Sequence, residues 1–251
     1  MSQFKGKVAV VTGGGRDIGR AISVQLAKEG AKVVINYNSS RAAAMKTLQE
    51  IESLKGKAII VKADISTIKG VKSLKAKTIK AFGKKVHILV NNAGGLFARK
   101  TLHEFDEEFY NLVMDVNFKG TVFTMQAFEP MMGKGSSIIN LSSLAARDGG
   151  GGGSSLYASS KGAVTTFTRA MAKELGPKGI RVNALCPGLI GTKFHDDFTK
   201  DEVRKIVAGK TPVRREGRAD EVADLVVYLA SDKSSFVTGA NFDINGGLAF
   251  S

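Results

Sequence analysis

Short runs of consecutive apolar residues recur along the chain, and the segments between them carry apolar residues at helical spacing. Apolar runs rich in valine and isoleucine are typical of strands that are buried on both faces of a sheet. The pattern predicts strands at Lys7–Thr12, Lys32–Asn36, Ala58–Lys62, Val86–Val90, Ser137–Leu141, Ile180–Leu185 and Ala240–Ile244. It predicts helices at Ile18–Glu29, Arg41–Leu54, Lys69–Lys85, Phe105–Phe118 with a continuation to about Met131, Leu156–Leu175, Asp201–Ala208 and Asp220–Leu229.

The regular alternation of strands and helices predicts an α/β fold. We expect a Rossmann-like, doubly wound parallel sheet of about seven strands with helices on both faces. The chain has no linker-like segment and no internal repeat, so we expect residues 1–251 to form a single domain. The one low-complexity segment, Gly149–Gly153, follows a predicted strand. Such folds bind ligands beyond the carboxyl ends of their strands, so this segment is interpreted as a loop of a binding site.

The chain carries a net charge of +14, and its densest basic stretch is Lys69–Lys85, with seven lysines and no acid. Since apolar residues in this stretch fall at helical spacing, we interpret it as an amphipathic helix with its lysines in water. The alternative is an electrostatic surface for nucleic acid or an acidic protein, and no nucleic-acid motif supports the first of these. A positive field also favours an anionic cofactor and substrate.

Cysteine content and hydropathy bear on the cellular compartment of the protein. Cys186 is the only cysteine, so no intrachain disulfide can form. No segment approaches the ~20 apolar residues that span a bilayer, and the N-terminus does not resemble a signal peptide. We therefore expect a cytoplasmic protein without a membrane partner and without a bound metal.

A glycine-rich turn, TGGGRDIG, follows the first predicted strand and opens a helix. In this context glycines let the backbone approach a pyrophosphate, and the helix N-terminus offers amides and a positive dipole. Thr12, Gly13 and Gly19 match the T-G-x-x-x-G-x-G motif of the short-chain dehydrogenase/reductase family, which the chain resembles. Asp17 stands where that family usually has glycine. We interpret Asp17 as the N-cap of a helix that begins at Ile18, and a contact with the cofactor is the alternative.

The resemblance extends along nearly the whole chain and implies that residues 1–251 form an NAD(P)-binding catalytic domain. It implies that Asp64 touches adenine, that the NNAG segment at 91–94 borders the cofactor, and that Thr192 bonds the nicotinamide amide. The implied cofactor-binding residues are Gly13, Gly15, Arg16, Asp17, Ile18, Gly19, Tyr37, Asn38, Ser39, Arg41, Asp64, Ile65, Asn91, Ala93, Gly94, Tyr157, Lys161, Pro187, Gly188, Ile190 and Thr192.

The end of the second predicted strand bears on the choice between the two nicotinamide cofactors. NAD sites place an acid there to hold the ribose 2′-hydroxyl, but residues 36–41 (NYNSSR) contain none. Arg16 and Arg41 can both bind a 2′-phosphate through paired hydrogen bonds. In related reductases a basic residue at the position of Arg16 accompanies NADP. We therefore predict NADP(H) in preference to NAD(H).

Tyr157 and Lys161 lie four residues apart in a predicted helix and so share one face. A neighbouring ammonium favours phenolate, so we expect Lys161 to lower the pKa of Tyr157. Tyr157 then donates a proton to a carbonyl oxygen as hydride reaches the carbon. The resemblance implies that Lys161 also binds the nicotinamide ribose and that Asn117 holds a proton-relaying water. It implies that Ser143 orients the substrate oxygen, with Ser142 as the alternative.

Loops over the predicted carboxyl edge, at 95–100, 147–156 and 189–215, are polar and glycine-rich, which suits a small polar carbonyl substrate. Their basic residues suit an anionic one; they are Arg99, Arg147, Lys193, His195, Arg214 and Arg215. Parts of these loops resemble reductases of keto sugar acids, such as the uronate released from alginate (4-deoxy-L-erythro-5-hexoseulose uronate). The alternatives are a 3-oxoacyl-(acyl carrier protein) reductase and a non-catalytic cofactor-binding or regulatory protein.

The family resemblance also has an implication for assembly. It implies a homotetramer in which the helices Phe105–Met131 and Leu156–Leu175 form one interface. The sequence itself shows only that both helices are apolar enough to pack against a partner.

Overall fold

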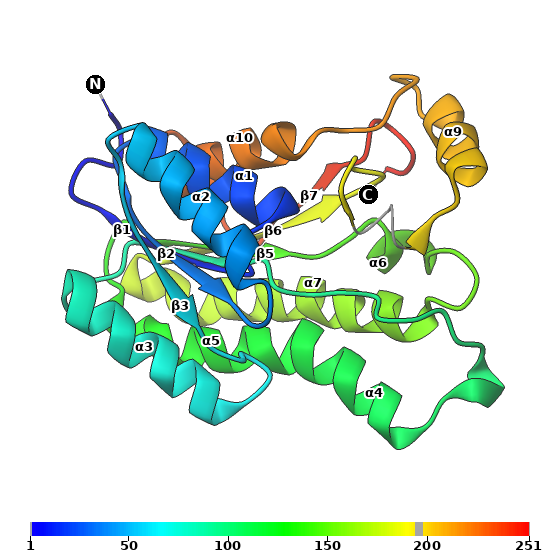
Figure 1. Ribbon diagram of the computed structural model, residues 1–251, viewed down its shortest axis with the longest axis horizontal. Helices are drawn as coiled ribbons and strands as arrows, with labels where there is room; N and C mark the ends of the chain where they lie inside the picture. The colour runs from blue at the N-terminus through cyan, green and yellow to red at the C-terminus, as the bar shows by residue number, and fades with distance from the viewer. Residues whose placement is uncertain (1, 194–197, 251) are drawn as a thin grey trace.

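The computed structural model describes residues 2–193 and 198–250 of the chain (Figure 1). Within these residues, seven strands form one sheet in the order β3-β2-β1-β4-β5-β6-β7, and every neighbouring pair is parallel. This order confirms the predicted Rossmann-like, doubly wound fold. The strands are β1 Val8–Thr12, β2 Lys32–Tyr37, β3 Lys57–Lys62, β4 Ile88–Asn91, β5 Ser137–Leu141, β6 Arg181–Pro187 and β7 Asn241–Ile244.

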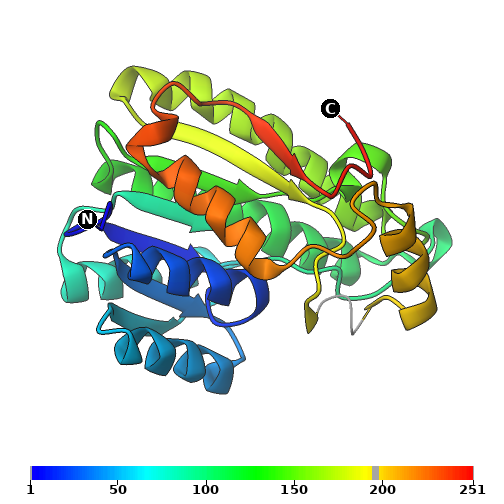
Figure 2. The same ribbon diagram turned by 90° about the horizontal axis from the view of Figure 1, so that it is seen from above.

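Helices cover both faces of the sheet (Figure 1). One layer contains α1 (Asp17–Lys28), α2 (Arg41–Ser53) and α10 (Ala219–Ala230). The other contains α3 (Ile68–Phe82), α4 (Glu107–Met114), α5 (Gly120–Phe128) and α7 (Ser155–Leu175). Two further helices, α6 (Ala145–Asp148) and α9 (Asp201–Lys210), lie beyond the carboxyl ends of the strands (Figure 2). Across the described ranges, no helix combines the length and the apolar character needed to cross a membrane.

β1 shows why the strands are apolar throughout. Val8 and Val10 face the core under α3, α5 and α7, whereas Ala9 and Val11 face the core under α1, α2 and α10. Since successive side chains of a strand point to opposite faces, a strand that is covered on both faces must be apolar at every position. Parallel pairing with β2 on one side and β4 on the other places β1 inside the sheet. The carboxyl end of β1 is therefore flanked by two other strand ends, which is where a site can form.

The helix predicted from Phe105 to about Met131 is confirmed over residues 107–131, with one irregular turn inside it. α4 begins after Asp106, whose carboxylate accepts a hydrogen bond from a first-turn amide at 2.6 Å. A π-helix, Asp115–Lys119, then separates α4 from α5. Such π-turns add one residue to a helical turn and occur frequently at functional sites. The π-turn here contains Asn117, which was a candidate catalytic residue.

Candidate active site

Side-chain hydrogen bonds join the ends of β1 and β4. The Thr12 hydroxyl accepts hydrogen bonds from the amides of Asn92 and Ala93 at 3.0 and 3.1 Å. The side-chain amide of Asn92 donates to the carbonyl oxygens of Thr12 and Gly13 at 3.0 and 3.1 Å. These bonds bring the glycine-rich turn and the NNAG segment to the same edge of the sheet.

The glycine-rich turn depends on contacts that a side chain would block. Gly13 has a φ of +61°, and a Cβ there would lie 3.0 Å from the Cα of Ala93. A Cβ at Gly19 would overlap the carbonyl oxygen of Gly13. Within the described residues, the backbone amides of residues 16–19 donate to no acceptor. Unpaired amides at a helix N-terminus are the donors that pyrophosphate oxygens use, so the turn fits a dinucleotide.

Asp17 does not cap α1, so that prediction is wrong. The helix begins at Asp17 itself, with Arg16 in an extended conformation at the N-cap position. Asp17 has a φ of +51°, a left-handed conformation that favours glycine and is tolerated by aspartate and asparagine. Its carboxylate accepts a hydrogen bond from the amide of Lys193 at 3.1 Å and lies 3.6 Å from Nε of Arg16. Asp17 therefore links the glycine-rich turn to the loop after β6.

Asn36 holds the end of β2 against the same turn. Its Oδ1 accepts a hydrogen bond from the amide of Gly13 at 3.3 Å, and its Nδ2 donates to the carbonyl oxygen of Ala63 at 2.9 Å. Sequence reasoning did not assign this role to Asn36. The available signal is a single polar residue at the end of an otherwise apolar strand, and a buried amide of this kind must find partners.

The residues predicted to bind the adenosine end of the cofactor differ in exposure. Arg16, Asn38, Ser39 and Arg41 are exposed, and Tyr37 and Ile65 are buried. The Asp64 carboxylate accepts hydrogen bonds from the amide and the hydroxyl of Ser66 at 3.0 and 2.7 Å, so it stabilises its own turn. The contact between Asp64 and adenine stays a prediction.

Lys161 and Asn117 are buried side by side below Gly94. Lys161 is buried on α7, and its Nζ donates a hydrogen bond to the carbonyl oxygen of Leu141 at 2.8 Å. The Asn117 side chain clamps the backbone of Gly95, accepting from its amide and donating to its carbonyl oxygen, both at 2.9 Å. A Cβ at Gly94 would lie 2.5 Å from Oδ1 of Asn117 and 3.0 Å from Nζ of Lys161. Glycine at this position therefore lets the two side chains approach one surface.

The two serines after β5 have different partners. The Ser143 hydroxyl is hydrogen-bonded to Tyr157 and accepts a hydrogen bond from the amide of Ala145 at 3.1 Å. The buried Ser142 hydroxyl donates to the backbone carbonyl oxygen of Lys161 at 2.8 Å. This geometry favours Ser143 over Ser142 as the serine that faces a substrate beside Tyr157.

The pKa of Tyr157, beside Lys161 on α7, is shifted in the direction opposite to the expectation. Burial raises the pKa of Tyr157, and the hydrogen bond from Ser143 offsets this only in part. The expectation that Lys161 lowers the pKa of this phenol is therefore wrong for this structure. The Lys161 ammonium lies 5.8 Å from the centre of the Tyr157 ring and is bonded to a backbone carbonyl instead. Burial also lowers the pKa of Lys161 from 10.5 to about 8.

A chain of buried polar side chains supports the site from below. Nδ2 of Asn91 donates to Oδ1 of Asn140 at 2.8 Å, and Nδ2 of Asn140 donates to the Thr168 hydroxyl at 2.9 Å. The chain joins β4, β5 and α7, so it fixes the helix that carries Tyr157 and Lys161 against two strands. Sequence reasoning missed Asn140 and Thr168, although a lone asparagine within the strand SIINL was a visible signal.

The loop after β6 brings the PGLIGT segment to the same edge. The amide of Gly188 donates to the carbonyl oxygen of Ile244 at 3.0 Å, which holds the start of the loop against β7. Ile190 is buried, and the Thr192 hydroxyl donates to its carbonyl oxygen at 3.2 Å. The contact between Thr192 and the nicotinamide stays a prediction. His195, a candidate substrate residue, lies outside the described residues.

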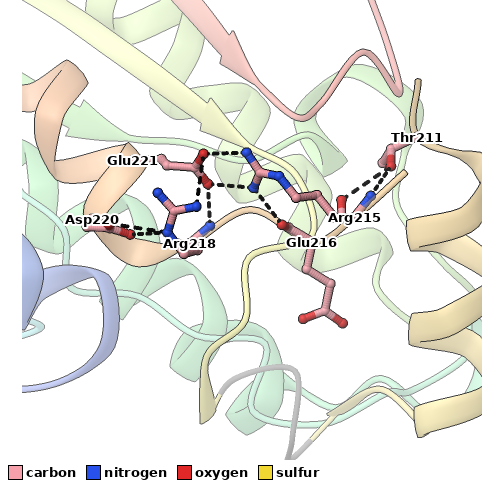
Figure 3. A network of polar contacts seen from close by, with 6 residues as sticks. All are labelled: Thr211, Arg215, Glu216, Arg218, Asp220 and Glu221. Atoms are coloured by element: carbon pink, nitrogen blue, oxygen red, sulfur yellow. Dashed lines mark hydrogen bonds and ion pairs between the residues drawn. The ribbon is translucent and has the colours of Figure 1, made fainter. Parts of the chain in front are cut away.

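Several basic side chains that were candidates for binding an anionic substrate are engaged within the protein. Arg147 forms an ion pair with Asp243 at 3.1 Å, and both side chains are largely buried. Figure 3 shows Arg215 turned toward Glu221, which it contacts through both terminal nitrogens at 2.9 and 2.6 Å. The Arg214 guanidinium donates to a backbone carbonyl oxygen at the end of α9. These contacts disperse the basic groups, so they do not support the prediction of a basic substrate pocket.

Comparisons with known proteins point to one family of oxidoreductases. A family model described as enoyl-(acyl carrier protein) reductase matches residues 13–249. An uncharacterized oxidoreductase of Methylorubrum extorquens is 38% identical over 250 residues, which cover 99% of this chain and 100% of that protein. The L-rhamnose 1-dehydrogenase (NAD(P)+) of Azotobacter vinelandii is 37% identical over 249 residues, 96% of each chain.

A solved structure gives the same result. A short chain dehydrogenase from Burkholderia cenocepacia J2315, in complex with NADP, has a TM-score of 0.89 to this chain at 33% identity and covers 98% of both chains. The fold, the glycine-rich turn and these matches together define an NAD(P)-dependent oxidoreductase. The chain belongs to the short-chain dehydrogenase/reductase family.

Proposed function

We propose that the chain is an NADPH-dependent carbonyl reductase in which Tyr157 donates the proton to the substrate oxygen. The observation that carries the proposal is the convergence of four polar side chains from three separate elements at one edge of the sheet. Tyr157 and Lys161 come from α7, Ser143 from the end of β5, and Asn117 from the π-helix. A protein that only binds a cofactor has no need of this acid and its supports.

The arrangement suits proton donation to a carbonyl. Bound NADPH supplies the hydride. The Tyr157 phenol carries its proton at neutral pH, as a proton donor requires, although burial raises its pKa and so makes it a weaker acid. Since the Ser143 hydroxyl is bonded to Tyr157, both groups can reach one substrate oxygen and stabilise the charge that develops there. We assign Lys161 the binding of the nicotinamide ribose, as the family resemblance implies; its ammonium lies 5.8 Å from the centre of the Tyr157 ring.

Asn117 has a supporting role in the proposed mechanism. Its side-chain amide is occupied with the backbone of Gly95, so we assign it the support of the loop that borders the nicotinamide. The relay water that the family resemblance implies would then lie between Asn117 and Lys161, which are neighbours across Gly94. We propose that a water molecule at this place relays protons.

The preference for NADPH rests on charge. The end of β2 carries no acid; the exposed Arg41 follows it at the start of α2, and the exposed Arg16 belongs to the glycine-rich turn. We propose that these two guanidiniums bind the 2′-phosphate, while the amides of the glycine-rich turn hold the pyrophosphate. NADP in the Burkholderia cenocepacia structure is consistent with this preference.

The substrate class proposed is a small polar carbonyl compound of sugar type. The similarity to an L-rhamnose 1-dehydrogenase supports a sugar. A keto sugar acid, such as the uronate from alginate, stays the first compound to test. Arg147 and Arg215 are paired with acids of the chain, so such an acid would have to be recognised by other groups.

The test is the loss of reduced-nicotinamide absorbance with the keto-uronate, with NADPH and NADH run side by side. L-rhamnose with NADP+ tests the reverse reaction on a neutral sugar. Fast oxidation of NADPH by the keto-uronate would support the sugar-acid assignment. Turnover of the neutral sugar alone would reject the acid and retain the reductase. Equal rates with NADH and NADPH would contradict the roles of Arg16 and Arg41.

A 3-oxoacyl-(acyl carrier protein) reductase is the second candidate. The observation that favours it is the row of exposed lysines on α3, namely Lys69, Lys72, Lys77 and Lys80, which would attract an acidic carrier protein. Acetoacetyl thioesters of the carrier protein and of coenzyme A, compared at low and high salt, test it. A carrier-specific rate that falls with salt would favour this candidate over a sugar.

We also propose a homotetramer that uses α4, α5 and α7. Leu102, Tyr110 and Leu112, before and within α4, are exposed apolar side chains that an interface would cover. Size-exclusion chromatography with light scattering measures the assembly, and a stable monomer would contradict it.

A further inference from the structure

Three segments at the carboxyl edge of the sheet meet at Arg99. Its Nη1 donates a hydrogen bond to the carbonyl oxygen of Gly152 at 2.8 Å, and its Nε donates to that of Phe198 at 3.2 Å. Gly152 belongs to the glycine-rich segment 149–153, and Phe198 lies between β6 and α9. One guanidinium on the loop after β4 thus contacts two segments that are distant in sequence.

The glycine-rich segment is shaped to receive this side chain. Gly153 has a φ of +71°, and a Cβ there would lie 2.9 Å from the Cβ of Arg99. Its carbonyl oxygen accepts a hydrogen bond from the amide of Lys100 at 3.1 Å. The segment therefore packs against residues 99–100 through both side-chain and backbone contacts. A flexible tether would need none of these contacts, so the glycines serve a close approach.

The loop that carries Arg99 continues directly from the candidate active site. Asn117 clamps Gly95 at one end, and Arg99 is held at the other. Between them, Phe97 has a φ of +66°, and its ring lies over Gly95, 3.3 Å from where a Cβ would be. A bulky residue in a left-handed conformation is strained and persists only when its surroundings hold it, which is common at functional sites.

We propose that Arg99 is a positioning residue that fastens these three segments together and thereby sets the affinity for the substrate. The inference rests on the proposed carbonyl-reductase function, which defines the substrate end of the site. Arginine suits this task because its planar fork directs several donors at fixed angles, whereas lysine offers one compact group. Nε and Nη1 of Arg99 both donate to neutral carbonyl oxygens, so we assign Arg99 the task of holding the segments together and not that of binding an anion.

Two substitutions at Arg99 distinguish the effect of its paired hydrogen bonds from the effect of its positive charge. Arg99→Lys keeps the charge and loses the fork, and Arg99→Ala loses both. Both variants should raise KM for the carbonyl substrate by about tenfold or more, while kcat falls by less than about threefold. The Kd for NADPH, from nicotinamide fluorescence, should stay within about twofold of the wild-type value. A wild-type KM in Arg99→Lys with a raised KM in Arg99→Ala would show that the charge acts alone, and would overturn the proposal.

The glycine-rich segment offers a matched pair of variants that leave Arg99 intact. At Gly153 a methyl group would meet the Cβ of Arg99 and force a strained backbone, whereas at Gly152 it would meet nothing within 4 Å. Gly153→Ala should therefore reproduce the raised KM of Arg99→Ala. Gly152→Ala keeps its carbonyl oxygen, so its KM should stay close to the wild-type value. Equal effects of the two substitutions would count against the proposal.

Amide hydrogen exchange gives a readout that needs no substrate. The amide of Lys100, bonded to Gly153, should exchange at least about tenfold faster in Arg99→Lys than in the wild type, because local opening becomes easier. Unchanged exchange would overturn the fastening even if KM rises. If no carbonyl compound is reduced by the wild type, the proposed function fails, whereas faster exchange in this variant would still support the fastening of the loops.

Discussion

The floor of the candidate site and its rim are built in opposite ways. On the floor, Asn117 and Lys161 are enclosed and bonded to the backbone of Gly95 and Leu141, and they are carried by helices that pack on the sheet. On the rim, Asp17 at the start of α1, Phe97 and three glycines of segment 149–153 have left-handed backbones and are exposed or half-exposed. The rigid elements hold the groups that would transfer a proton, and the loops hold those that would select the ligand.

The largest effect expected on the floor is that of Tyr157→Phe. The substitution removes one hydroxyl, so turnover should fall by about a thousandfold or more, because general acid catalysis is lost. Binding of NADPH, measured by fluorescence, should persist. Tyr110→Phe is the matched control, since Tyr110 is exposed on α4. A Tyr157→Phe variant that keeps a tenth of the wild-type rate would remove Tyr157 from the proposed chemistry.

Lys161→Met tests the cost of burying a charge on the floor. The pKa of Lys161 is about 8 in the folded protein against 10.5 for the free side chain. Below pH 8 both states hold the proton and the buried ammonium destabilises the fold. Between pH 8 and 10.5 the folded state has lost its proton and the unfolded state has not, so that penalty disappears. The free energy of unfolding of the wild type should therefore rise by roughly 3 kcal/mol relative to Lys161→Met between pH 7 and pH 10.5.

Urea unfolding of both proteins across this pH range makes the measurement. Lys173→Met is the control, because Lys173 lies on the same helix and is exposed. A constant difference between wild type and Lys161→Met would mean that Lys161 titrates alike in the folded and unfolded states. The floor would then be more accessible to water than its geometry indicates.

Ser143 and Ser142 have different roles on the floor. Ser143 is the serine proposed to meet the substrate, whereas Ser142 supports α7. Ser143→Ala should lower kcat by about a hundredfold, because it removes a donor near the substrate oxygen. It should also raise the pKa of Tyr157 further, since the Ser143 bond lowers that pKa. Ser142→Ala should cost about 1 kcal/mol of stability by breaking the bond to the Lys161 carbonyl, with a smaller change in kcat. Rates at several pH values and thermal unfolding distinguish the two, and a reversed pattern would exchange the serines.

The floor was largely predictable from the sequence and the rim was not. Apolar strands that alternate with helices predict a parallel sheet whose carboxyl strand ends lie at one edge, so Tyr157, Lys161 and Ser143 converge for reasons of topology. The direction of the Tyr157 pKa was missed, because burial and the carbonyl partner of Lys161 are tertiary facts. Contacts such as Asn91 to Asn140 were missed for the same reason, since they join residues far apart in sequence.

The rim was missed because loop contacts depend on positions rather than periodicity. The six basic candidates had a common charge in the sequence, but Arg147 is bonded to Asp243 and Arg99 to two carbonyl oxygens. Aspartate is a preferred N-cap residue, so the sequence predicted that Asp17 caps the first helix. Its left-handed backbone instead sends the carboxylate to the amide of Lys193.

Asp17→Asn tests the smallest effect expected on the rim, at the point where the rim meets the proposed cofactor site. The Asp17 carboxylate sits in the first turn of α1, whose amides are the proposed partners of the pyrophosphate, so the two anions compete for one positive helix end. Asparagine tolerates the left-handed backbone and keeps an oxygen for the Lys193 amide, so only the charge changes. The Kd for NADPH should fall by about threefold to fivefold at low salt, and the gain should shrink at high salt. Glu52→Gln, an exposed and distant charge removal on α2, should leave the Kd unchanged. A weaker Kd in Asp17→Asn would show instead that the carboxylate's hold on the loop after β6 matters more for binding than its repulsion of the phosphates.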